Sequence, residues 1–413
     1  MISEHRVHLF GNTEMNALYV TLGFLAFAEG LISIFVPIFF WNLGFPMWKI
    51  LLFYFLHSAM FLLFMLTLLP LIKKLSDKMM MFLSIPFLVL YFLGLGTIKA
   101  LPILFFALPI ASAMHTLLFN VGYNIDFSCA ADRARIGKEV GIRYVLISIL
   151  TLAAPFFGGV LIKMAGFQNA FFMGSAILFM SVLPLFFFPD RNMSPNLRMQ
   201  SIMPFFREPE LKPFTLSGIG YAAETVLSKT IWPLFIFLII GDIEQFGGII
   251  SIGLIVTAIV TYLVGYLSDY GKRRNVITWT SIGNALAWFI RPFILQPPLV
   301  VGMHIGGNVV NSGLMVAWTS QYYKITKTVS DTTAFIISRE LLYNAARVIF
   351  IPILMLIAYV LPTKTFFALG FILAGCASLL FLTANKTHAH LLTGLMTLKH
   401  VDADTTPHQQ PQG

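Results

Sequence analysis

Apolar runs of about 20 residues recur along the whole chain, and charges interrupt them rarely. A helix rises about 1.5 Å per residue, so one such run spans the roughly 30 Å hydrocarbon layer of a membrane. Charged residues make up 11% of this chain and apolar residues 58%, whereas a soluble domain carries about 25% charged residues. The sequence therefore predicts an all-α integral membrane protein in a lipid bilayer.

We expect twelve membrane-spanning helices, each an apolar run bounded by charges, proline or glycine. Their expected limits are 15–41, 49–71, 79–97, 101–125, 140–163, 168–189, 213–240, 246–267, 275–295, 299–321, 334–361 and 364–384. No small-residue cleavage site follows a short apolar core near the start, so the first apolar run is expected to remain as a span.

The longest polar interruption lies at the middle of the chain, at residues 190–212. It predicts two six-helix bundles, residues 13–189 and 213–384, joined by a cytoplasmic linker. Residues 1–12 are expected to form a cytoplasmic N-terminus. Residues 385–413 are polar and are expected to form a disordered cytoplasmic tail.

The Lys and Arg residues gather in alternate loops. The loops across the membrane from the N-terminus hold only Lys49, Lys99, Lys163, Arg291 and Lys364. Because cytoplasmic loops carry the excess of Lys and Arg, both termini are expected in the cytoplasm, with the protein in a bacterial-type cytoplasmic (inner) membrane. The net charge of +9 then reflects topology, and no nucleic-acid partner is expected.

The second half repeats features of the first, which indicates an internal duplication and two pseudo-symmetric bundles. The first span contains Glu29, Ser33 and Pro37, and the seventh contains Glu224, Ser228 and Pro233 in the same order. Leu-Ser-Asp follows both the second and the eighth span, ending at Asp77 and Asp269. Before the fifth and eleventh spans, the matching pairs are Lys138-Glu139 and Arg339-Glu340.

The loop GYLSDYGKRRN resembles the loop signature of the major facilitator superfamily. The residues that carry the resemblance are Gly265, Leu267, Asp269, Gly271, Arg273 and Arg274. The turn after the fifth span, APFFGGVLIKMAGFQNAFF, also looks like that of the family. The resemblance implies two six-helix bundles around a central site and transport by alternating access. The family's frequent arginine in the fourth helix is absent here, and His115 stands in that span instead.

In the family this charged loop belongs to a cytoplasmic latch, in which an aspartate at one helix end meets charges of the other bundle. The resemblance implies that Asp269 and Arg273 meet the start of the fifth span, and that Asp77 meets the start of the eleventh. The full set of implied gate residues is Asp77, Asp269, Arg273, Lys138, Glu139, Arg143, Arg339 and Glu340. The alternative is that the loop is only a solvated topology anchor.

Polar and charged residues inside spans are costly, so each is a candidate for a substrate or proton pathway. We expect Glu29 and Glu224 to face one shared aqueous site, because the first and seventh spans line the cavity in the resembling family. The further candidates are Lys229, Asn308, Asn311, Asn344, Arg347, His57 and His115. Each of these has a structural alternative, such as bracing its own helix or packing against a neighbour.

The sequence lacks the patterns of an ATP-driven pump or an enzyme: no phosphate-binding loop and no catalytic or metal-ligating constellation is visible. Neither a metal nor a cofactor is expected. The hypothesis is a monomeric secondary transporter of a small solute, with proton-coupled export of an amphipathic compound as its finer form. The alternatives are an uncoupled uniporter or importer of a small polar solute, and a membrane receptor that transports nothing.

Overall fold

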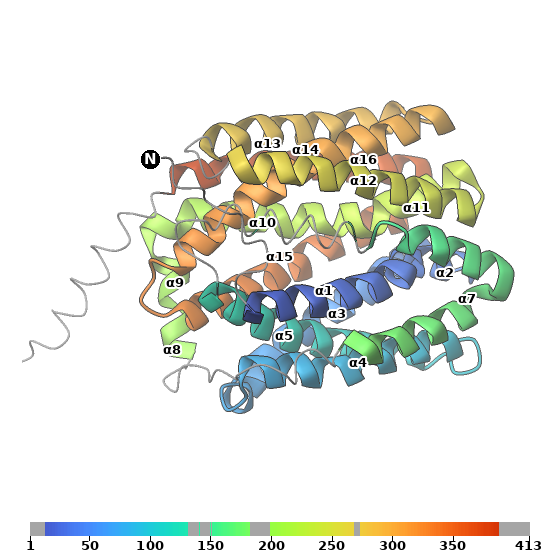
Figure 1. Cartoon of the computed structure of the whole chain (residues 1–413). Helices are drawn as coiled ribbons and strands as arrows, with labels where there is room; N and C mark the ends of the chain where they lie inside the picture. Colours follow the sequence, from blue (N-terminus) through green and yellow to red (C-terminus); the bar gives the residue numbers. More distant parts are fainter. Residues whose placement is uncertain are drawn as a thin grey trace, which may run out of the picture.

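The computed structural model describes residues 13–130, 151–181, 199–267 and 273–387, together with residues 140 and 149. Long helices dominate these residues and run roughly side by side (Figure 1). The elements are α1 (Thr13–Ile32), η1 (Ser33–Phe35), α2 (Val36–Asn42), α3 (Met47–Ile72), α4 (Asp77–Thr97), α5 (Leu104–Ala130), α7 (Ala154–Ser181), α8 (Met199–Ile202), α9 (Pro204–Arg207), η3 (Pro209–Leu211), α10 (Lys212–Val226), η4 (Leu227–Ile231), α11 (Trp232–Ile240), α12 (Ile243–Leu267), α13 (Arg273–Ile290), η6 (Arg291–Phe293), α14 (Pro297–Thr326), α15 (Thr332–Val360), α16 (Thr363–Leu379) and η7 (Leu380–Lys386).

Ten helical segments in the described part of the chain are long and apolar enough to cross a membrane. One of them, α7, is two helices joined at Gly166, whose backbone takes φ 81° and ψ 167°. This turn falls between the expected fifth and sixth spans, as the glycine-containing stretch predicted. The ninth expected span corresponds to α13, which is shorter and less apolar than these ten segments.

The first and seventh spans are both interrupted just before a proline. In the first span, the 3-10 turn η1 precedes Pro37, and in the seventh, the π-helical turn η4 precedes Pro233. Proline has no backbone N–H and its ring clashes with the carbonyl one turn earlier, so regular helix is disturbed there. The matched positions of the two breaks agree with the repeat that the sequence suggested.

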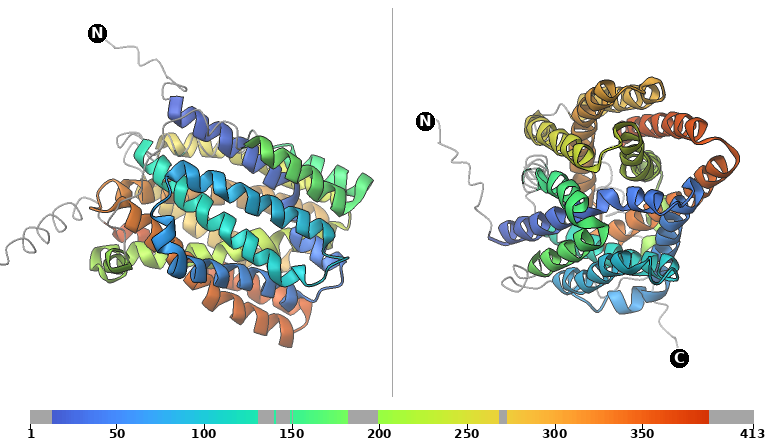
Figure 2. Two further views of the ribbon diagram at one scale, coloured as in Figure 1. Left: turned by 90° about the horizontal axis from the view of Figure 1, so that it is seen from below. Right: turned by 90° about the vertical axis from the view of Figure 1, so that its right-hand side faces the viewer.

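The helices fall into two groups that follow the order of the chain. In Figure 1, α1, α3, α4 and α5 gather on one side and α12, α13 and α14 on the other. The groups touch where α3 packs along α15 and where α7 packs along α12. Figure 2 shows the helices from two further directions, including nearly end-on. We call the end that holds α8 and α9 the linker end, and the end with Gly166 and Gly241 the opposite end.

Part of the expected polar linker is folded. Residues of α8, α9 and η3 make short turns at the linker end, and α8 and α9 pack against α15. The ring of Phe205 lies 5.5 Å from that of Phe335, which anchors these turns to α15. The apolar residues within 199–211 therefore have a packing role that a purely polar linker would not need.

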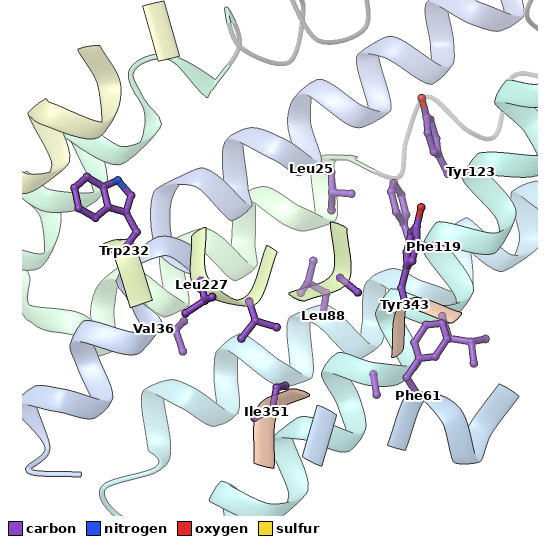
Figure 3. Packing of buried hydrophobic residues seen from close by; sticks show 14 of the residues in the cluster. Leu25, Val36, Phe61, Leu88, Phe119, Tyr123, Leu227, Trp232, Tyr343 and Ile351 are labelled. Carbon is purple, nitrogen blue, oxygen red and sulfur yellow. The ribbon is translucent and has the colours of Figure 1, made fainter. Parts of the chain in front are cut away.

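Buried apolar side chains of both halves form one continuous cluster. Figure 3 shows part of this cluster, including Val36 and Phe61 from the first half and Leu227 and Tyr343 from the second. Because lipid is as apolar as these side chains, close van der Waals packing rather than hydrophobic expulsion holds such helices together.

Candidate functional site: a central cavity between the halves

A cavity of about 490 Å³ lies between the two halves of the protein. Residues of α3, α4 and α5 line it from the first half, and residues of α10, η4, α14 and α15 line it from the second. Its volume is in the range of pockets that bind small molecules. Its position between two helix groups is where an alternating-access carrier holds its cargo.

A polar stripe on α5 forms one wall of the cavity. Ser112, Thr116, Asn120 and Asn124 all line it, and they are spaced four residues apart. Residues four apart lie on the same face of a helix, so this face of α5 is turned toward the cavity. His57 on α3 joins the stripe, because its Nδ1 lies 3.0 Å from the hydroxyl of Ser112.

Three cationic side chains line the cavity from the second half, with only one carboxylate among the lining residues. They are Lys229 in η4 and Arg339 and Arg347 in α15. The carboxylate, Glu340, is bound to the guanidinium of Arg339. No described carboxylate forms an ion pair with Lys229 or Arg347. The cavity therefore carries a net positive charge.

Aromatic rings make up much of the remaining wall. The ring of Tyr221 stacks on Trp318 at a centroid distance of 4.9 Å and meets Tyr343 at 4.8 Å. Phe53 and Tyr91 face the cavity from the first half. Such flat, apolar walls favour a ligand with an apolar body beside its charged group.

Contacts between the halves close the cavity toward the linker end. The hydroxyl of Tyr323 on α14 donates to Oδ1 of Asn124 on α5 (2.7 Å), and Ser128 donates to Thr326 (2.8 Å). The rings of Phe127 and Tyr323 also meet at 4.5 Å. These contacts must break for the cavity to open on this side.

A second set of contacts closes the opposite end. Nζ of Lys163 on α7 lies 3.2 Å from Asp242 and 2.8 Å from Glu244, which begin the α12 region of the other half. Behind this ion pair the backbones approach closely. A Cβ on Gly159 would lie 2.6 Å from the carbonyl oxygen of Ile243, so only glycine fits there. Among the described residues, contacts thus join the halves at both ends.

The ion pair at the opposite end should loosen only in acid. The backbone N–H of Gln245 and the Lys163 ammonium hold the pKa of the Asp242 carboxyl below its usual range. A lowered pKa means that Asp242 supports the closed state at every pH above the ordinary value, and that this support is lost as pH falls through the lowered pKa. We expect a spin-label pair at Met164→Cys and Gln245→Cys to report a constant distance from neutral pH down to about pH 4. The distance should lengthen below that.

The control for this prediction is Lys163→Gln in the same labelled background, with Cys129 and Cys376 replaced by serine. Without the ammonium, Asp242 has no partner across the halves, so the distance should be longer at neutral pH already and less sensitive to acid. An identical pH profile in both proteins would show that the ion pair does not hold the opposite end closed.

Glu29 and Glu224 do not share one aqueous site, which corrects the expectation from the sequence. Neither carboxylate lines the central cavity. Oε1 of Glu29 on α1 faces Nε2 of His115 on α5 at 3.7 Å, and its side chain is 41% exposed. The Nδ1–H of His115 donates to the carbonyl oxygen of Ser84 (3.1 Å).

Glu224 instead lies inside the second bundle and is buried. Oε1 of Glu224 accepts a hydrogen bond from Nε1 of Trp288 (3.1 Å) and one from Asn311 (3.4 Å). Arg291, 5% exposed, interacts electrostatically with Glu224 and lies over the ring of Trp288 at 3.5 Å. Glu224 and Lys229 project from different sides of the seventh span, Glu224 into its own bundle and Lys229, within the π-turn, to the cavity.

The three asparagines also lie away from the cavity wall. Asn308 bonds His304 (3.1 Å) and Asn311 bonds Glu224, both within the second bundle. Asn344 is buried and its amide donates to the backbone carbonyl of Glu340 on the same helix (3.0 Å). Of the predicted pathway residues, the cavity thus brings together Lys229, Arg347 and His57.

Three of the eight predicted gate residues have described side chains, and the structure does not bring all three together. Arg339 and Glu340 lie on the cavity wall rather than against Asp77, which is buried at the start of α4. The neighbouring Arg274 donates to the backbone carbonyl of Asn385, within its own half. The remaining gate residues, namely Asp269, Lys138, Glu139, Arg143 and the side chain of Arg273, lie outside the described part of the chain.

Sequence reasoning missed the polar stripe on α5, the Tyr323–Asn124 contact and the ion pair of Lys163. The stripe has a visible signal, which is four polar residues at intervals of four in an apolar span. The other contacts join residues 79 to 199 positions apart, and nothing local announces them. Among the described residues no cluster of three or more His, Cys, Asp or Glu is placed to hold a metal ion.

The fold is that of a major facilitator transporter. A solved structure with a similar fold is the human organic anion transporter MFSD10 (TETRAN), which superposes with a TM-score of 0.65. The match covers 89% of this chain and 98% of the human one, at 11% sequence identity. No family model and no curated protein matches the sequence itself. The likeness lies in the arrangement of helices, which confirms the fold that the loop signature suggested.

Proposed function

We propose that the chain is a secondary transporter that carries a small organic anion across the membrane by alternating access of the central cavity. The observation that supports this most is the position of the cavity. Both halves line it, and separate contacts join the halves toward each end. Breaking one set while keeping the other would expose the cavity to one side at a time.

The charge of the cavity supports an anionic cargo. Lys229 and Arg347 have no described carboxylate partner, and a cation facing a low-dielectric cavity is stabilised by an anion in it. The human relative with a similar fold is an organic anion transporter, which agrees with this assignment. A neutral polar solute, the alternative that relied on Asn308, Asn311 and Asn344, has less support because these side chains do not line the cavity.

Glu29 and His115 supply a place for a coupling proton. Because Nδ1 of His115 donates to Ser84, the neutral ring presents the lone pair of Nε2 to the Glu29 carboxylate at 3.7 Å. Two acceptors face each other, so binding of one proton turns a repulsive contact into an attractive one. His57, from α3, interacts electrostatically with His115, and Tyr91, from α4, with Glu29.

We place the linker end in the cytoplasm of a cytoplasmic-type membrane and treat the monomer as the working unit. The distribution of Lys and Arg between loops supports this orientation. Export is the direction that the sequence hypothesis favours. With a proton released inward on each cycle, the anion would move outward in exchange for the proton held at Glu29 and His115.

Flux into liposomes tests the function and the coupling together. Sulfonates stay charged at every working pH, so any pH effect on their transport comes from the protein. We expect the purified chain to move benzenesulfonate or benzenedisulfonate faster than empty liposomes do, and a pH gradient to change the rate. In Glu29→Gln the flux should persist while its dependence on the gradient is lost.

The matched control is Glu210→Gln, which removes a carboxylate from η3 at the linker end. It should behave as wild type. Binding of the sulfonates without flux would favour the receptor, and flux without any dependence on the pH gradient would favour a uniporter. Neither binding nor flux of any sulfonate would overturn the assignment of an organic anion cargo.

A further inference from the structure

The two cations of the cavity that lack a carboxylate partner among the described residues come from different helices. Lys229 belongs to the π-turn η4 in the seventh span, and Arg347 belongs to α15. Both line the same cavity, whereas Arg339 is already bound to Glu340. A cargo with one anionic group would compensate only one of the two free cations.

Lys229 is presented to the cavity by an irregular backbone. Residues 227–231 form a π-turn, which is rare and occurs frequently at functional sites. Pro233 lies two residues after the turn and lacks the N–H that would bond the backbone carbonyl of Lys229 in a regular helix. A helix irregularity in mid-span is costly in lipid and persists where it lines a cavity.

No described carboxylate forms an ion pair with Lys229 or with Arg347. Glu224 does act on Lys229 electrostatically, but its stronger interaction is with Arg291 inside the second bundle. Glu29 faces His115 on the other half. The positive charge at Lys229 and at Arg347 is therefore left for the cargo to compensate.

We propose that the cargo is an organic dianion with a flat apolar body, whose two anionic groups bind Lys229 and Arg347. The body lies against the rings of Tyr221 and Trp318, which stack at 4.9 Å and face the same cavity. The proposal rests on the proposed function and specifies the substrate class of its site. Under this proposal, Lys229 is the residue that gives the site its preference for a dianion over a monoanion.

The test compares three probes that share one ring and differ in charge: benzenesulfonamide, benzenesulfonate and benzenedisulfonate. Their binding to the purified full-length protein is measured by titration calorimetry at neutral pH. For wild type we expect the dianion to bind about tenfold or more tightly than the monoanion, since it makes a second charge-assisted contact. The neutral sulfonamide should bind weakest.

Lys229→Gln should bind the dianion at least about tenfold more weakly than wild type, while its affinity for the monoanion changes less than about threefold. Arg347→Gln should also lose the preference for the dianion. The charge-matched control is Lys364→Gln, at an exposed position near the start of α16. It should keep both affinities.

The outcomes separate the two proposals. Equal binding of monoanion and dianion by wild type, or an equal loss of both in Lys229→Gln, overturns the dianion and leaves an anion carrier. Preference for the neutral sulfonamide overturns the anionic cargo itself, and with it both proposals. Folding of each variant is checked by its melting temperature, and Arg347→Gln tests the proposal independently if Lys229→Gln is unstable.

Discussion

Glu224→Leu is expected to destabilise the second bundle by about 3–5 kcal/mol, the cost of leaving a buried charge without its partner. Arg291 is 5% exposed, and its guanidinium lies 4.1 Å from the ring of Trp232 and 3.5 Å from that of Trp288. Its Nε and Nη1 have no hydrogen-bond partner. Glu224 is the carboxylate that acts most strongly on it, so removing that charge leaves the cation uncompensated.

The loss is measured as a drop in melting temperature or in the denaturant midpoint of the protein in detergent. The matched control is Glu29→Leu, which removes the equivalent carboxylate of the first half, where the side chain is 41% exposed. That variant should lose far less. Combining Glu224→Leu with Arg291→Leu should recover most of the stability, because no unpaired charge remains. A single variant as stable as wild type would show that the pair is not a folding element.

Gly247→Val is expected to shift the protein toward a state that is open at the opposite end. A Cβ at Gly247 would lie 2.3 Å from the backbone oxygen of Pro155 on α7, and backbone cannot move aside as a side chain can. Overpacking costs about 1–3 kcal/mol, which corresponds to roughly a 5- to 150-fold change in the balance of open and closed states. Flux should fall because the closed state is part of every cycle.

The spin-label pair at Met164→Cys and Gln245→Cys reports this opening as a longer distance. The neighbouring Gly248→Val is the control, because a Cβ there meets only Phe156, at 3.9 Å. It introduces the same β-branched side chain into α12 without the clash. If both variants gave the same distance and flux, the close approach of α7 and α12 would not govern access to the cavity.

Much of the architecture was predictable because the sequence features that indicate a membrane-spanning helix lie within that helix itself. Apolar length set the helices, Gly166 set the turn within α7, and Pro37 and Pro233 marked the breaks in the first and seventh spans. Two spans came out longer than expected: α5 runs to Ala130 and α14 to Thr326. Their ends are polar, but residues such as Ser128 and Thr326 satisfy each other between the halves.

The candidate site was predictable only in part. Lys229, Arg347 and His57 were named from the rule that charge inside a membrane is costly, and the cavity does bring them together. The same rule named Glu224 and Asn311, which instead bond to each other inside the second bundle. Intramembrane position alone does not say which way a side chain points.

The sequence by itself determined that this chain forms long membrane-spanning helices and where proline and glycine interrupt them. These properties depend on hydrophobic length and on the backbone chemistry of proline and glycine. Only the tertiary structure decided which polar residues meet. Glu224 and Lys229 are five residues apart and project from different sides of the seventh span, so one faces Trp288 and the other the cavity. The direction of a side chain depends on helix rotation, and packing against other helices sets that rotation.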